Sequence, residues 1–106
     1  MAANRIEYHE GATGDLRSAV SWYRERSPKA ALEFIDELNR AAQIIAKAPD
    51  RWPKGSSGAR CFLLWRFPFT VIYSYDKSVI TIWAVAHASR RPEYWADRRQ
   101  VSDRTP

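Results

Sequence analysis

The chain has little of several features that define other classes of protein. It contains a single cysteine, Cys61, so no disulfide can form within it. Its two histidines, His9 and His87, lie far apart and far from that cysteine, a spacing that matches no metal-ligand pattern. No apolar run approaches the length of about 18 residues that suggests a membrane-spanning helix, and the first residues lack the apolar segment of a secretion signal. These absences predict a soluble, cytosolic protein that uses no metal or other cofactor.

Lysine is scarce in the second half of the chain, where only Lys54 and Lys77 occur, yet that half carries the net charge. Residues 1–53 hold eight basic and eight acidic side chains, whereas residues 54–106 hold nine basic and four acidic ones and therefore supply all of the +5. Such asymmetry indicates an acidic partner, either nucleic acid or an acidic protein segment. A solubilising surface is the alternative reading of the same charge.

Aromatic residues are plentiful, with five tryptophans, five tyrosines and four phenylalanines in 106 residues. Large rings bury much area each, so a chain of this length can pack as a single domain over residues 1–106. Leu16, Ala19, Val20 and Tyr23 recur at helical spacing, and the pair Ser27-Pro28 suits the cap and first position of a second helix. The sequence predicts strands over residues 6–9, 59–65, 69–75 and 79–87, a helix hairpin over about 12–47, and a last helix from Pro92 to about Gln100.

This order of elements predicts an α+β fold. An N-terminal strand leads into an antiparallel helix hairpin, which packs on one face of a mainly antiparallel four-stranded sheet, and a short C-terminal helix follows. A hairpin of two helices can cover only one face of such a sheet. The other face, or part of it, must therefore meet water or a partner.

Motifs spread through most of the chain resemble the RelE/ParE superfamily of toxins from bacterial type II toxin–antitoxin modules. The matching residues are Asp15-Leu16, Ala19, Trp22-Tyr23, Ala31, Phe34, Leu38, Ala42, Pro49, Trp52-Pro53, Phe69-Thr70-Val71-Ile72-Tyr73, Ala84-Val85-Ala86-His87, Arg90, Pro92 and Tyr94-Trp95. The resemblance implies the fold above, a cognate antitoxin and a growth-inhibiting activity. It leaves two targets open, because RelE-like members cut messenger RNA on the ribosome whereas ParE-like members inhibit DNA gyrase.

Cleavage of RNA without a metal would require proton transfer at the 2′-hydroxyl and the leaving oxygen, and a cation at the phosphate. His87, Tyr94 and Arg66 are the candidates for these roles if the protein is a ribonuclease. Guanidinium and aromatic groups near the basic end are candidates for contacts to nucleic acid or a partner. These residues are Arg60, Arg90, Arg91, Arg98 and Trp95. The structural alternative has His87 capping backbone groups and Tyr94 and Trp95 locking the last helix onto the sheet.

The scarcity of lysine argues against a nuclease that works on the ribosome, because such a protein needs a dense basic surface against ribosomal RNA. The long helix hairpin is also closer to the ParE-like pattern. The sequence therefore favours a toxin that acts on DNA gyrase, with ribosome-dependent cleavage of messenger RNA and a non-toxic basic binding module as alternatives.

Overall fold

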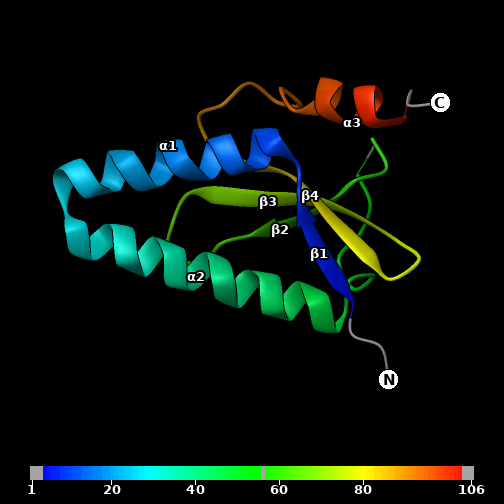
Figure 1. The fold of residues 1–106 in the computed structure, drawn as a ribbon, viewed down its shortest axis with the longest axis horizontal. Coiled ribbons are helices and arrows are strands. Elements are labelled where there is room, and N and C mark those ends of the chain that lie inside the picture. Colours follow the sequence, from blue (N-terminus) through cyan, green and yellow to red (C-terminus); the bar gives the residue numbers. More distant parts are fainter. Residues whose placement is uncertain (1–3, 56, 104–106) are drawn as a thin grey trace.

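The computed structural model describes residues 4–55 and 57–103 (Figure 1). The elements are β1 (Arg5–Tyr8), α1 (Glu10–Arg26), α2 (Pro28–Lys47), β2 (Arg60–Leu63), β3 (Phe69–Asp76), β4 (Val79–His87) and α3 (Ala96–Asp103). Ser27 caps α2 by accepting a hydrogen bond from the Ala30 N–H at 3.2 Å, and Pro28 is the first helical residue. The predicted turn between the helices is therefore confirmed, since a short polar side chain and a proline fit these two positions.

The strands of the described residues form one sheet in the order β1-β4-β3-β2. β3 runs antiparallel to both of its neighbours, while β1 runs parallel to β4. The helix hairpin lies along one face of this sheet, and α3 lies near the first turns of α1 (Figure 1). The predicted α+β architecture is confirmed.

The edges of the sheet matter for the candidate site. β1 is short and pairs only with the first half of β4, up to the partnership of Tyr8 with Ile82. Within residues 4–55 and 57–103, no strand therefore lies beside the second half of β4 on that edge. Its backbone groups need other hydrogen-bond partners, because unpaired amides and carbonyls are costly to bury.

A bulge in β4 changes which side chains face the helices. Ile72 pairs with Ala84 and Tyr73 pairs with Ile82, so Trp83 is one extra residue between them. Trp83 and Ala84 join the same buried cluster, away from the hairpin, and the indole N–H of Trp83 donates to the Ser74 hydroxyl at 2.9 Å. The bulge thus places a large ring on the outer face of the sheet.

Two apolar clusters hold the fold together. The main one fills the space between the hairpin and the sheet and includes Phe34, Ile45, Tyr73, Ile80 and Ile82, all fully buried. The second lies on the outer face of the sheet, where Trp95 from the C-terminal segment packs with Ala59, Ile72, Trp83 and Ala84. The outer face is therefore partly covered by the protein itself.

Some element bounds differ from those predicted. The strand expected over 59–65 spans only Arg60–Leu63, and the last helix begins at Ala96 rather than near Pro92. Glu93 has a left-handed backbone (φ 58°), which interrupts a right-handed helix, so residues 92–95 form turns instead. The last helix was predicted to end at about Gln100, but α3 extends to Asp103, and residues 104–106 lie outside the described residues.

Candidate functional site

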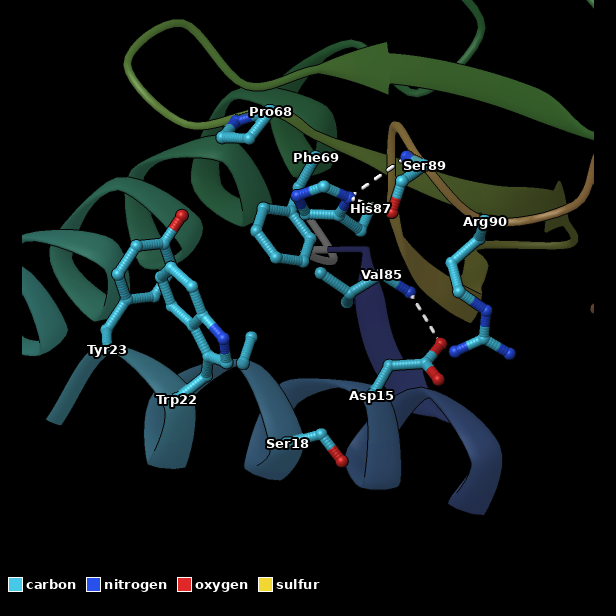
Figure 2. A pocket seen from close by; sticks show the side chains of 11 residues that line it. Asp15, Ser18, Trp22, Tyr23, Pro68, Phe69, Val85, His87, Ser89 and Arg90 are labelled. Carbon is cyan, nitrogen blue, oxygen red and sulfur yellow. Dashed lines mark hydrogen bonds between the residues drawn. The ribbon is translucent and has the colours of Figure 1, made fainter. Parts of the chain in front are cut away.

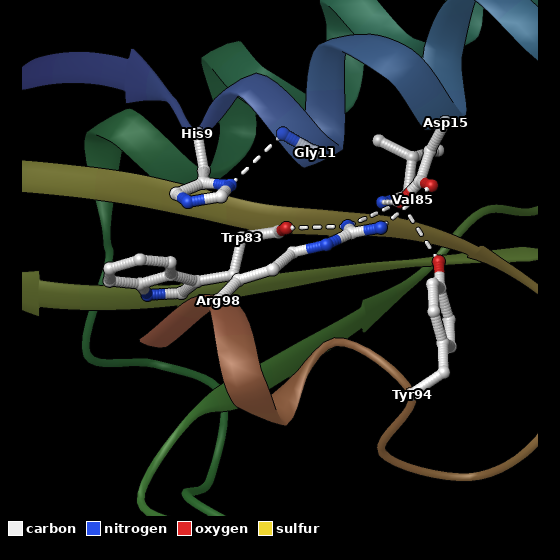
Figure 3. Close-up of polar contacts among 7 residues, drawn as sticks. All are labelled: His9, Gly11, Asp15, Trp83, Val85, Tyr94 and Arg98. Atoms are coloured by element: carbon white, nitrogen blue, oxygen red, sulfur yellow. Dashed lines mark hydrogen bonds and ion pairs between the residues drawn. The ribbon is translucent and has the colours of Figure 1, made fainter. Parts of the chain in front are cut away.

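Asp15 on α1 is the centre of a polar cluster at the open edge of β4. Its carboxylate accepts the backbone N–H of Val85 at 3.1 Å, the hydroxyl of Tyr94 at 2.8 Å and both terminal nitrogens of Arg98 at 2.8 and 3.2 Å (Figure 3). The Asp15 side chain is only 8% exposed. Four donors to one buried carboxylate make a fully satisfied ion pair.

This Asp15 cluster takes the place of the missing strand beside β4. Arg98 donates to the carbonyl of Trp83 at 2.9 Å, while Asp15 accepts the N–H of Val85. Both backbone groups lie just beyond the end of β1. Figure 3 shows α1 on one side of β4 and the C-terminal segment on the other, with the two meeting at this edge. The cluster therefore joins α1, the sheet and α3.

The electrostatics of the cluster favour fixed protonation states. Burial, then the hydrogen bond to Asp15 and its negative charge, raise the pKa of Tyr94 to about 12. The hydrogen bond to Asp15 also raises the pKa of Arg98. A phenol with so high a pKa keeps its proton at neutral pH, which makes Tyr94 a poor general base.

A pocket of about 520 Å³ lies between α1 and the adjoining ends of β3 and β4 (Figure 2). We call it the His87 pocket. Its lining residues are Asp15, Ser18, Ala19, Trp22, Tyr23, Pro68, Phe69, Val85, His87, Ser89 and Arg90. One face of α1 forms its floor, because the lining positions of that helix recur at steps of three and four residues. The pocket combines apolar walls with a polar end at His87, Ser89 and Arg90.

His87 is held in one orientation in this pocket. Its Nδ1 accepts the backbone N–H of Ser89 at 2.9 Å and lies 2.7 Å from the Ser89 hydroxyl. The ring also packs edge-on against Phe69, with centroids 5.0 Å apart. Because Nδ1 is an acceptor, the neutral ring carries its proton on Nε2. That N–H is available as a donor to a bound group.

The other residues predicted for the site lie in several places. Arg90 lines the His87 pocket, with its guanidinium carbon 3.9 Å from the ring centroid of Tyr94. Arg66 pairs with Glu33 of α2 at 2.8 Å, and Arg60 donates to the carbonyls of Asp50 and Trp52.

Trp95 is 5% exposed and packs in the outer cluster, while Arg91 is exposed beside it on the outer face. The structure thus brings together His87 with Arg90, and Tyr94 with Arg98, but not all of the candidates at once. Their functional roles stay predictions.

Asp15 and Ser18 are polar residues of the site that the sequence did not single out for a role there. The spacing holds a usable clue for Asp15, which lies three residues after Ala12 and four before Ala19, both fully or nearly fully buried. A carboxylate on the buried face of a helix needs a partner, so it indicates an ion pair. Trp22, one of the residues that carry the family resemblance, is 52% exposed and lines the pocket.

Two further observations concern what the described residues hold. Residues 4–55 and 57–103 contain no group of three or more histidine, cysteine, aspartate or glutamate side chains placed to bind a metal ion. None of their helices is long and apolar enough to cross a membrane.

Residues 6–92 match the family model described as "ParE toxin of type II toxin-antitoxin system, parDE". The chain belongs to this ParE toxin family. Its fold is similar to a solved structure of the "Chromosomal ParDE TA system from P. aeruginosa", with a TM-score of 0.71 and 18% sequence identity over 80% of this chain and 96% of that chain. Comparison with curated proteins gives no match.

The predicted RelE/ParE resemblance is therefore confirmed, and the match is to the ParE branch. At 18% sequence identity, the similarity to the solved structure shows that the two proteins share a fold. The chain is a ParE-like toxin of a type II toxin–antitoxin system.

Proposed function

We propose that this ParE-family toxin inhibits DNA gyrase in the cytoplasm and is neutralised by a cognate acidic antitoxin. Membership of the ParE family over residues 6–92 is the observation that carries the proposal. ParE-like members are the gyrase-directed branch of the superfamily, so family membership favours this target over messenger RNA.

The arrangement of the candidate catalysts also supports the proposal. A metal-free ribonuclease needs its proton-transfer groups and a phosphate-binding cation around one phosphate. Here the Tyr94 hydroxyl is held by Asp15 and keeps its proton, and the Arg66 guanidinium is paired with Glu33. His87 has Ser89 as its polar neighbour. Each group thus has a structural partner of its own, which suits a protein that acts by docking.

An antitoxin of acidic character fits the charge of the chain. All of the +5 comes from residues 54–106, and that segment forms β2, β3, β4 and α3. An acidic segment that folds over this half would gain electrostatic complementarity and a faster encounter. Neutralisation would then follow from covering the surface that the target needs.

The experiment that tests the target separates DNA damage from arrest of translation. The chain is expressed from a tightly repressed promoter, and an SOS reporter, protein synthesis and mapped message ends are followed over time. In parallel, the purified protein is added to gyrase in a DNA supercoiling assay that contains no ribosomes. A core variant, Phe34→Asp, is the inactive control, because a carboxylate at this fully buried position prevents folding.

We expect early SOS induction, filamentous cells and loss of supercoiling activity with the wild-type chain only. Arrest of protein synthesis before any SOS response, with message cuts in phase with codons, would refute gyrase as the target. That outcome would instead assign the ribosome-dependent nuclease activity and make His87 the first catalyst to test.

A further inference from the structure

The His87 pocket combines an apolar interior with a positively charged end. Its walls include Ala19, Trp22, Phe69 and Val85, and its volume of about 520 Å³ falls in the range of sites that enclose a ligand group. Trp22 lines the pocket and is half-exposed, and the guanidinium carbon of Arg26 lies 3.8 Å from its ring centroid. A large apolar side chain from outside would fit this interior.

The charge at the pocket end is not cancelled by the residues around it. Among the described residues no carboxylate pairs with Arg90, whose guanidinium is oriented by stacking on Tyr94. His87 presents its Nε2 side, because Nδ1 is engaged by Ser89. Asp15 is the acidic residue in the lining, and Arg98 already neutralises it at 2.8 Å. The end of the pocket therefore favours an anion.

We propose that the His87 pocket is an anchor site for an acidic peptide segment. One large apolar side chain of the segment enters between α1 and the sheet, a neighbouring carboxylate is held by Arg90, and the Nε2–H of His87 donates to a second acceptor of the segment. The inference rests on the proposed function in one respect, since the antitoxin is the acidic chain that would supply such a segment. It adds the location of the anchor and the chemistry of the residues that fill it.

Other occupants fit the pocket less well. A nucleic acid needs a row of cations along its backbone, whereas this pocket offers Arg90 at one end and an apolar interior. A second copy of the chain would bring another net charge of +5 to a site that is already positive. An acidic peptide satisfies both the apolar interior and the cationic end.

The test uses three fluorescein-labelled, amidated hexapeptides of sequence EELFEE, QQLFQQ and EEAAEE, and the purified full chain. Binding is measured by fluorescence anisotropy, and the site is located from chemical-shift changes of the Trp22 indole and the His87 ring. Ser18→Trp fills the pocket mouth from an exposed position, and Ser21→Trp adds the same ring to α1 on the side away from the pocket. Arg90→Glu reverses the charge at the pocket, and Arg24→Glu does so elsewhere.

We expect EELFEE to bind the wild-type chain and to lose about tenfold or more in affinity with Ser18→Trp and with Arg90→Glu. Ser21→Trp and Arg24→Glu should bind as wild type does. QQLFQQ and EEAAEE should each bind more weakly than EELFEE, since each lacks one of the two features. Thermal unfolding of every variant checks that it is folded.

The proposal is overturned if EELFEE does not bind up to its solubility limit, if QQLFQQ binds equally well, or if the paired variants behave alike. A single-stranded RNA hexamer that shifts the same resonances more strongly than EELFEE would assign the pocket to nucleic acid. The supercoiling assay is run on the same protein samples. Gyrase inhibition without peptide binding refutes the anchor alone, whereas peptide binding without gyrase inhibition refutes the target alone.

Discussion

Replacing Asp15 by asparagine should destabilise the toxin strongly, although the two side chains have nearly the same shape. The substitution removes the charge that pairs with Arg98. The Asn oxygen can replace Oδ2 and keep the hydrogen bonds from Val85 and Tyr94, but the amide N–H₂ then lies where Oδ1 accepted from Arg98, so two donors face each other. The loss combines a broken ion pair with unsatisfied polar groups at a nearly dry site.

The magnitude follows from the burial of the two partners. Removing one member of a buried ion pair costs about 3–5 kcal/mol, and the lower end applies here because the Arg98 side chain is 20% exposed and regains some hydration. We expect a loss of about 3 kcal/mol in the free energy of unfolding. For a domain of this size that corresponds to a fall of about 12–24 °C in Tm.

Urea unfolding followed by circular dichroism measures this change, and hydrogen exchange locates it. The amide of Val85 should exchange faster in Asp15→Asn, because the neutral Asn oxygen is a weaker acceptor and loss of the ion pair with Arg98 loosens this edge of β4. Asp36→Asn is the matched control, since Asp36 is exposed on α2, and it should stay within about 0.5 kcal/mol of wild type. If Asp15→Asn were as stable as this control, the cluster would not be the link between α1, β4 and α3.

Three further predictions concern single side chains. Gly14→Ala should stabilise α1 by up to about 1 kcal/mol, whereas Gly11→Ala should destabilise the protein by about 1 kcal/mol or more, because its Cβ would overlap the Arg98 side chain; urea melts of the two variants, side by side, decide this. The raised pKa of Tyr94, about 12 against 10 in the unfolded chain, stabilises the fold fully below pH 10, and this stabilisation is lost as pH rises towards 12. Tyr94→Phe should therefore lose less stability than wild type between pH 10 and 12 in alkaline titrations, and equal losses would contradict the assignment. Glu37→Gln should cost about 1–3 kcal/mol, since this buried carboxylate accepts two backbone N–H groups of the β2–β3 turn, and an unchanged urea midpoint would show that the turn does not depend on it.

The sequence alone determined the order of the helices and strands and the α+β class of the fold. Apolar spacing and the Ser27-Pro28 pair placed the helix hairpin, and alternation placed the later strands, because both patterns depend on residues a few positions apart. The RelE/ParE family could also be recognised from the sequence, since its motifs occur in order along the chain. The predicted strands over 69–75 and 79–87 leave only three residues between them, and the positive backbone φ angles at Lys77 and Ser78 form the tight hairpin turn that so short a connection requires.

Only the tertiary structure decided how the candidate residues are grouped. Tyr94 and Arg98 reach Asp15 across 79 and 83 residues of sequence, and the bulge at Trp83 depends on the pairing of two strands. Such contacts arise from the register of the sheet and from the point where β1 ends, and no local pattern encodes either. For the same reason the sequence grouped His87, Tyr94 and Arg66 as one possible site, while the fold gives each of them a different partner.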